Sequence, residues 1–403
     1  MIEEQIESKL IEQIKTGEHV IASLPFKGNS LFSGKLGRIL YLAYNYKLLG
    51  NEENIETAVT YLDELFDYFK SGSPEAILEI PWVLPSLCRV IMTLNQDNII
   101  DIELQDDEFF VFDEMVYKSA KTYLANNNID FLYGAAGALS YLVNRIDYNG
   151  KIKDYITDAF ESLMLLKMED EHGVRFFNSH ISKQNRSADI DLGVAHGQSG
   201  LILVLLDIYK AGILQPEIRG LIIGMLKYIL GLERKPERAD GVYSYFPVTI
   251  DENFARTAPE NIKKYNDRMG WCYGDLNIAL VFYRCADVLN MPELLIKADT
   301  LGRDTCTRLT EEESGIENAH LCHGSASMVL MYNALYREQP LPEYMDTKNF
   351  WMEYTHNYIQ NELKDPESNG RAEQLLMGIP GVMLVLINEA LGGNQKWQSI
   401  FLM

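Results

Sequence analysis

The sequence predicts an all-α protein, folded as a closed ring of inner helices wrapped by a ring of outer helices. Two observations predict it. Apolar residues recur at the spacing of one helix face along most of the 403 residues, whereas the alternation typical of strands is weak throughout. In addition, glycines three residues apart recur at the start of alternate predicted helices. A repeat of this kind is typical of packed helical hairpins.

The first predicted helix illustrates the periodicity, because its isoleucine and leucine residues form one stripe with polar residues opposite. By the same criterion, helices are expected at residues 2–16, 35–48, 54–70, 84–95, 110–125, 134–146, 152–167, 198–210, 216–232, 275–289, 292–310, 325–337, 348–363 and 380–391.

The recurring glycines define the repeat. The leading glycines of six clear motifs are Gly34, Gly134, Gly197, Gly274, Gly324 and Gly378, with gaps of 100, 63, 77, 50 and 54 residues. The first gap is twice the shortest, and the proline-containing stretch Pro81–Ser86 lies near its middle, so we expect seven hairpin repeats with a degenerate second one. A single glycine pair usually reflects close helix packing alone. Six at similar spacing indicate inner helices that all begin at one end of the ring.

Composition narrows the classes of function. The chain carries 36 basic and 58 acidic residues, a net charge of −22, which disfavours a nucleic-acid partner. The five cysteines are sparse and odd in number, which favours a reducing, cytoplasmic compartment. The N-terminus does not resemble a signal peptide, and no uninterrupted apolar stretch reaches the roughly 18 residues of a membrane helix. We therefore expect no transmembrane segment.

The chain shows no Gly/Ser-rich or Pro-rich linker, so residues 1–403 are expected to form a single domain. The two longest predicted loops, 178–191 and 235–266, are polar and are candidates for a rim or lid over one end of the ring.

Two cysteine motifs suggest a metal site. Cys272 and the pair Cys322–His323 each precede a glycine that starts a predicted helix, where a thiolate is favoured by the helix N-terminus. Two thiolates and an imidazole are zinc ligands, and three protein ligands leave a fourth position open for chemistry. The alternative for Cys-His-Gly alone is a buried thiol beside a capping histidine. The other three cysteines, Cys88, Cys285 and Cys306, lie in apolar helical patterns and are expected to be buried and structural.

Three further residues share the register of these motifs. His196, before Gly197, is expected to face the same cavity as a general acid or base, although a lone histidine is more often structural. Asp130 could point into the ring or cap the following helix. Arg268, four residues before Cys272, either lies along the edge of the site or is a solvated surface group.

Together, Trp271-Cys272-Tyr273-Gly274, Cys322-His323-Gly324, His196-Gly197 and the recurring glycine pairs resemble the lanthionine synthetase C-like family of lanthipeptide cyclases over nearly the whole chain. The resemblance implies a double-ring toroid of seven inner and seven outer helices. It also implies one zinc ion per chain, bound by Cys272, Cys322 and His323, with His196 and Asp130 as an acid/base pair and Arg268 orienting or polarising the site. The chain departs from the pattern at Asn277 and Ser327, which stand where a second glycine is expected.

The implied reaction is thioether formation, in which a cysteine thiol of a precursor peptide adds to a dehydroalanine or dehydrobutyrine of the same peptide. A dehydrated precursor peptide is then the substrate, and a dehydratase and a peptide transporter are implied partners that could hold the protein at the membrane periphery. Three alternatives remain. The protein could add glutathione or other thiols to dehydrated residues, could be a prenyltransferase-like zinc α-barrel enzyme, or could be a scaffold with a closed zinc site in which His320 is the fourth ligand.

Overall fold

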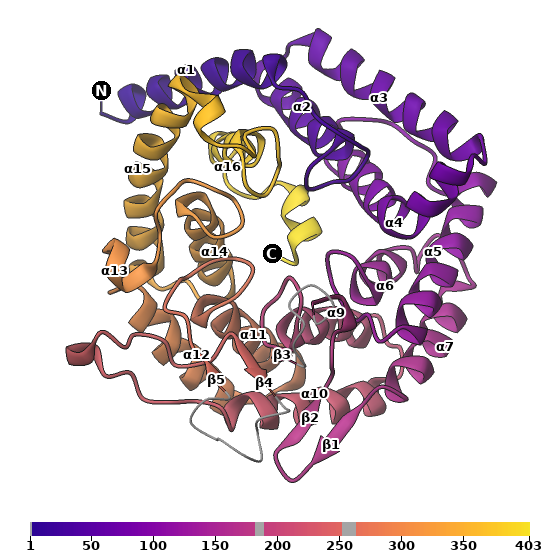
Figure 1. Ribbon diagram of the computed structural model, residues 1–403, viewed down its shortest axis with the longest axis vertical. Helices are drawn as coiled ribbons and strands as arrows, with labels where there is room; N and C mark the ends of the chain where they lie inside the picture. The colour runs from indigo at the N-terminus through magenta and orange to yellow at the C-terminus, as the bar shows by residue number, and fades with distance from the viewer. Residues whose placement is uncertain (1, 182–188, 252–262) are drawn as a thin grey trace.

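Alternate helices of the computed structural model form an inner ring (Figure 1), and the structure describes residues 2–181, 189–251 and 263–403. Each inner helix packs against the next in chain order and the last packs against the first, which closes the ring. The inner helices are α2 (Lys35–Leu49), α4 (Pro74–Gln96), α6 (Ala135–Asn144), α9 (Gln198–Lys210), α11 (Asp275–Leu289), α14 (Ser325–Glu338) and α16 (Ile379–Ala390).

An outer helix follows each of the first six inner helices and packs against it, while the N-terminal helix α1 packs against α16. The outer helices are α3 (Glu52–Lys70), α5 (Asp107–Ala125), α7 (Ile152–Met164), α10 (Gln215–Leu230), α12 (Pro292–Thr305), α15 (Pro342–Lys364) and α1 (Ile2–Ser23). The described residues thus form the predicted toroid of seven inner and seven outer helices. The inner helices are apolar on most sides because they are covered by the outer ring and by one another.

Helix α4 shows the largest difference from the predicted boundaries. The helix was expected to begin at residue 84, but it begins at Pro74 and contains Pro81 and Pro85 in its interior. A proline inside a helix removes one backbone hydrogen bond and costs about 3 kcal/mol. Packing compensates for this cost, because every residue from Val83 to Leu94 is buried.

Among the described residues α4 is also the one helix long and apolar enough to cross a membrane by length and composition, and 67% of that window is buried inside the protein.

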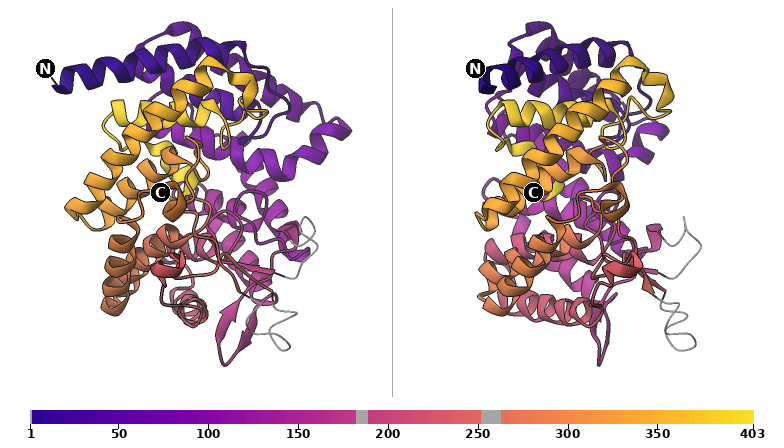
Figure 2. Two further views of the ribbon diagram at one scale, coloured as in Figure 1. Left: turned by 60° about the vertical axis from the view of Figure 1, so that its left-hand side comes forward. Right: turned by 90° about the vertical axis from the view of Figure 1, so that its left-hand side faces the viewer.

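Short non-helical elements lie between the hairpins. Strands β1 (Met168–Asp170) and β2 (Gly173–Arg175) form an antiparallel hairpin, and β3 (Asp189–Asp191), β4 (Thr249–Asp251) and β5 (Lys263–Lys264) form an antiparallel sheet in that order. This sheet joins the two loops predicted as a rim, and Figure 2 shows it on one side of the ring. Residues 182–188 and 252–262 of those loops lie outside the described residues. The remaining short helices are α13 (Glu311–Ser314), η1 (Arg238–Asp240), η3 (Pro366–Ser368) and η4 (Lys396–Phe401).

The C-terminal segment lies in the centre of the ring (Figure 1). Trp397 and Phe401 of η4 are fully buried, and Phe401 packs edge-on against Trp271 with ring centroids 5.1 Å apart. The Trp271 indole N–H donates a hydrogen bond to the Phe401 carbonyl at 2.8 Å. The last residues therefore fill the space inside the ring and contact the segment that carries Cys272.

The loops before the inner helices are hydrogen-bonded to one another, and we call the end of the ring that they form the mouth. The loops are residues 28–34, 128–134, 191–197, 266–274, 318–324 and 369–378. Backbone hydrogen bonds link neighbouring loops, including Phe131 N to Ala195 O, Val194 N to Cys272 O, Trp271 N to Cys322 O, Cys322 N to Leu376 O and Leu375 N to Phe32 O, at 2.9–3.3 Å. Cys272 and Cys322 thus belong to adjacent loops of one hydrogen-bonded chain, which explains how residues fifty positions apart converge.

A buried histidine joins the two ends of the chain. His356 of α15 is 7% exposed; its Nδ1 contacts the Gln13 side-chain oxygen of α1, and its carbonyl accepts a hydrogen bond from Gln13 Nε2 at 3.0 Å. Burial lowers the pKa of His356 to about 4. Because an unfolded histidine titrates near pH 6.5, the unfolded state takes up a proton between about pH 6.5 and 4 that the folded state excludes.

We therefore expect the His356 contribution to stability to be present above about pH 6.5 and to be lost as the pH falls toward 4, by on the order of 2 kcal/mol. The measurement is the free energy of unfolding of the wild type and of His356→Gln at pH 7 and 4.5, and the variant should lose less stability on acidification. His172→Gln, which alters an exposed histidine, is the control. Equal acid sensitivity of the wild type and His356→Gln would contradict the prediction.

Candidate metal and acid/base site

Three soft ligand groups meet at the mouth. One ligand atom each from Cys272, Cys322 and His323 lies within 4.8 Å of the other two, and the Cys272 sulfur is 3.8 Å from His323 Nδ1. Within residues 2–181, 189–251 and 263–403 this is the one such group of three ligand side chains. Cys272 is buried, while Cys322 and His323 are partly exposed, so the group can be approached from the mouth.

Glycines allow the two ligand loops to approach this closely. A Cβ on Gly270 would lie 2.8 Å from the His323 Cβ, closer than two carbon atoms can pack. Gly274, which begins α11, has φ of +104°, a conformation that strongly favours glycine, and a Cβ there would lie 2.9 Å from the Arg268 carbonyl oxygen. Gly270 therefore lets the two ligand loops approach each other, and Gly274 lets the Cys272 loop turn into α11.

The donor set fits zinc. Zinc bonds of about 2.0–2.3 Å to nitrogen and sulfur require ligand atoms within roughly 4 Å of one another, which small side-chain movements of these three residues would provide. Burial and the neighbouring Cys322 raise the pKa of the Cys272 thiol, whereas a hydrogen bond from Cys272 lowers the pKa of Cys322. One sulfur is thus already suited to be a thiolate before a cation neutralises the pair.

An aspartate–histidine pair lies at the same end of the ring. His196 Nδ1 is 2.7 Å from Asp130 Oδ2, and Asp130 is fully buried. Although burial opposes charge on the imidazole, the carboxylates of Asp130 and Asp191 raise the pKa of His196 to about 9, and the negative charge of Cys322 acts in the same direction. His196 is therefore protonated near neutral pH in the described arrangement, with its other ring nitrogen free of Asp130.

Asp130 has both of the roles considered from the sequence. Its Oδ1 accepts hydrogen bonds from the backbone N–H groups of Leu132 and Tyr133 at 2.8 and 2.9 Å, which closes the turn before α6. Its Oδ2 accepts from Asn178 Nδ2 at 2.9 Å as well as contacting His196. The Asp130 carboxylate thus has four partners. It closes the turn before α6 and orients His196 at the same time, so the two roles are not alternatives.

The sequence analysis missed two neighbours of this pair. Asn178 donates to both Asp130 and the His196 carbonyl, at 2.9 and 2.8 Å. The ring of His180, which lacks a motif of its own, lies 6.5 Å from that of His196 and 5.3 Å from that of Tyr133. Both residues come from the loop after β2, which was predicted to lie over one end of the ring, but only the fold brings these two side chains to the His196 pair.

Arg268 lies at the edge of the site. Its Nε donates to the Gly315 carbonyl at 3.1 Å, and its guanidinium is 3.9 Å from Glu317. Its positive charge also acts on the Tyr273 side chain, where it opposes the burial that raises the pKa of that hydroxyl, and the Tyr273 ring stacks 6.3 Å from that of His323. Arg268 is therefore close to Tyr273, which lies against one of the three ligand side chains.

His320 is bound elsewhere. Its Nε2 lies 3.3 Å from Glu362 of α15 and 3.1 Å from the Asn369 amide. These contacts direct the His320 ring toward the outer helix.

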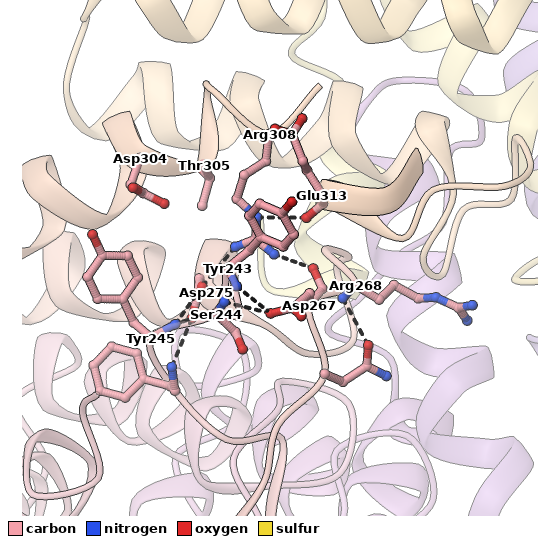
Figure 3. A network of polar contacts seen from close by, with 12 residues as sticks. Tyr243, Ser244, Tyr245, Asp267, Arg268, Asp275, Asp304, Thr305, Arg308 and Glu313 are labelled. Carbon is pink, nitrogen blue, oxygen red and sulfur yellow. Dashed lines mark hydrogen bonds and ion pairs between the residues drawn. The ribbon is translucent and has the colours of Figure 1, made fainter. Parts of the chain in front are cut away.

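A buried polar network fixes both ends of the segment that carries Cys272 (Figure 3). Asp275, in the first turn of α11, accepts hydrogen bonds from the backbone N–H groups of Tyr245 and Phe246 and from Arg308 at 2.9–3.2 Å. Arg308 also donates to the Asp267 carbonyl, and Asp267 in turn accepts from the N–H of Ser244 at 2.6 Å.

Breaking this network should destabilise the fold. In Arg308→Ala the Asp275 carboxylate, which is 0% exposed, would be left without its cation, and we expect a loss of about 3–5 kcal/mol in the free energy of unfolding. Chemical denaturation measures the loss. Arg303→Ala, which removes an exposed ion pair with Glu343, is the control and should cost less than about 1 kcal/mol. Similar losses in the two variants would argue against the network's role.

The chain is similar to known proteins over its full length. The sequence model of the family described as "Lanthionine synthetase C-like protein" matches residues 3–402. The solved structure "Nisin cyclase" superposes with a TM-score of 0.67 and 16% identity, covering 99% of this chain and 97% of that one, which shows a common fold. A sugar epimerase from a ruminal bacterium aligns at 14% identity over 77% of this chain and 86% of its own, with a TM-score of 0.41 that is too low to show a common fold. With nearly every residue matched, the chain belongs to the lanthionine synthetase C-like family.

Proposed function

We propose that the protein is a zinc-dependent lanthionine synthetase, a cyclase that joins cysteine thiols of a dehydrated precursor peptide to dehydroalanine or dehydrobutyrine residues. The observation that carries the proposal is the meeting of Cys272, Cys322 and His323 within 4.8 Å at the mouth of the ring. Family membership supports the reaction class, and the nearby His196–Asp130 pair supports proton transfer.

The three ligand side chains are proposed to hold one zinc ion, which would keep a substrate thiol deprotonated and nucleophilic near neutral pH. The partial exposure of Cys322 and His323 leaves a side from which the thiol can enter. Holding the thiol and the alkene of one peptide close together at the mouth would raise the rate by removing the entropic cost of their encounter.

The addition balances without an external oxidant or reductant. The thiol proton is released to solvent, the sulfur forms a bond to the β-carbon of the dehydrated residue, and the alkene electron pair moves toward the carbonyl as an enolate. A proton then reaches the α-carbon. We assign its delivery to His196, whose position is held by Asp130 at 2.7 Å and whose raised pKa keeps the imidazole protonated.

Arg268 is proposed to act at the edge of the site. Its positive charge acts on the Tyr273 side chain, whose ring stacks against that of the ligand His323. The proposed substrate must be supplied by a reaction that dehydrates serine or threonine, so a dehydratase is a natural partner. The transporter stays a prediction from the family resemblance.

The test combines metal analysis with mass spectrometry. Ring formation leaves peptide mass unchanged, so a dehydrated precursor is incubated with and without the protein and its free thiols are then alkylated. We expect about one zinc per chain and one fewer alkylated thiol for each ring formed. Addition of glutathione to the peptide without ring closure would favour the intermolecular alternative. Protein with bound zinc that leaves every peptide thiol free would contradict the proposed function.

A further inference from the structure

Ser327 occupies a position where the repeat pattern has a glycine. It lies in the first turn of α14, three residues after Gly324, and is fully buried. The corresponding position in α11 is Asn277, whose side-chain amide has no hydrogen-bond partner among the described residues. A polar side chain at this position of the repeat therefore does not always form a hydrogen bond. The hydrogen bonds of Ser327 depend on its own surroundings.

The Ser327 hydroxyl lies between the two segments that carry the metal ligands. Its Oγ accepts a hydrogen bond from the backbone N–H of Trp271 at 2.6 Å and donates to the Cys322 carbonyl at 3.3 Å. The same Trp271 N–H also reaches the Cys322 carbonyl at 3.1 Å. One side-chain oxygen thus joins the residue before Cys272 to Cys322 itself.

Trp271 is immobilised on its other side as well. Its indole N–H donates to the Phe401 carbonyl, and its ring packs against Phe401. With the indole anchored in the centre of the ring, the backbone hydrogen bond to Ser327 is the shortest of the bonds that set where the adjacent Cys272 lies relative to Cys322, since the N–H groups of Trp271 and Cys272 reach the Cys322 carbonyl at 3.1 and 3.4 Å. In the absence of the hydroxyl, the Trp271 N–H would retain only the longer bond to Cys322, and the two ligand loops would lose a buried connection.

We propose that Ser327 is a positioning residue of the metal centre, which sets the separation of Cys272 and Cys322 before the cation binds. This inference rests on the proposed zinc site, and it concerns how tightly the metal is retained rather than the rate of ring formation. Partners that orient metal ligands typically contribute 10–100-fold to affinity. Removal of the hydroxyl should therefore accelerate zinc release by about tenfold.

The test uses the full chain loaded with zinc. Zinc release to a chromophoric chelator is followed for the wild type, Ser327→Ala and Ser327→Gly, and cobalt(II)-substituted protein reports ligand geometry through its absorption bands. The two variants that lack the hydroxyl should both release zinc about tenfold faster and show shifted cobalt bands. Ser327→Thr, which keeps the hydroxyl, should restore slow release; if Ser327→Ala is poorly folded, the glycine and threonine variants still decide.

A neighbouring serine is the matched control. Ser325 lies in the same turn of α14 and is equally buried, and its hydroxyl accepts a hydrogen bond from Thr355 Oγ1 at 2.8 Å, so Ser325→Ala removes no side-chain contact between the ligand loops. Ser325→Ala should keep wild-type release and cobalt bands. Equal release rates in folded Ser327→Ala, Ser327→Gly and Ser325→Ala would overturn the inference. That result would leave the proposed function intact if the wild type still cyclises its peptide. If zinc retention depended on the Ser327 hydroxyl but no peptide were cyclised, the proposed function alone would be contradicted.

Discussion

Replacement of Cys322 by alanine is expected to abolish both zinc binding and thioether formation. The variant keeps only Cys272 and His323, and the loss in zinc affinity should exceed the roughly 100-fold that removal of an outer-shell partner costs. The substrate thiol would then remain largely protonated at neutral pH, because a free cysteine has a pKa of about 8.5. Metal content and the count of alkylated peptide thiols measure the two effects.

Cys306→Ala is the control for this prediction. Cys306 is a partly exposed cysteine at the end of α12, where its thiol contacts the Gly302 carbonyl. Its removal should change neither zinc content nor ring formation. If Cys322→Ala retained one zinc per chain and cyclised the peptide at the wild-type rate, the assignment of the ligands would be wrong.

The second large effect is expected from His196, whose replacement should slow ring formation without removing zinc. His196→Asn should bind zinc normally but form rings about 10²–10⁴-fold more slowly, because the protonated group that is proposed to quench the enolate is lost. Asp130→Asn should also slow ring formation, because it removes the charge that holds the His196 proton. The same substitution should lower stability, because Asp130 accepts four hydrogen bonds while fully buried.

The rate of ring formation and the zinc content are measured on the same preparations. His320→Asn changes another partly buried histidine of a mouth loop, one bound to Glu362 and Asn369, and it should keep wild-type activity. A His196→Asn variant that closed rings at the wild-type rate would assign the proton transfer to another group. Loss of zinc in that variant would instead place His196 among the metal-binding residues.

Much of the architecture could be predicted from the sequence because the repeat is local. The apolar period identifies each helix, and the glycine before each inner helix identifies its start, as at Gly134 and Gly274. The second repeat is the exception. Its helix α4 begins ten residues before the predicted start, and burial of its later turns outweighs the cost of Pro81 and Pro85. The boundary depends on tertiary packing, which no local pattern contains.

The sequence by itself determined the fold class, the family motifs and the three candidate ligands, because these depend on residue type and on spacing within one loop. The tertiary structure alone decided which side chains surround them. Asn178 and His180 reach the His196 pair across a loop without regular spacing, and Arg308 reaches Asp275 from the loop after α12. In the sequence Ser327 stands where the repeat has a glycine, and only the closed ring places the Trp271 N–H within hydrogen-bonding distance of its hydroxyl. Contacts between distant segments depend on how the helices pack, and packing is a property of the whole ring.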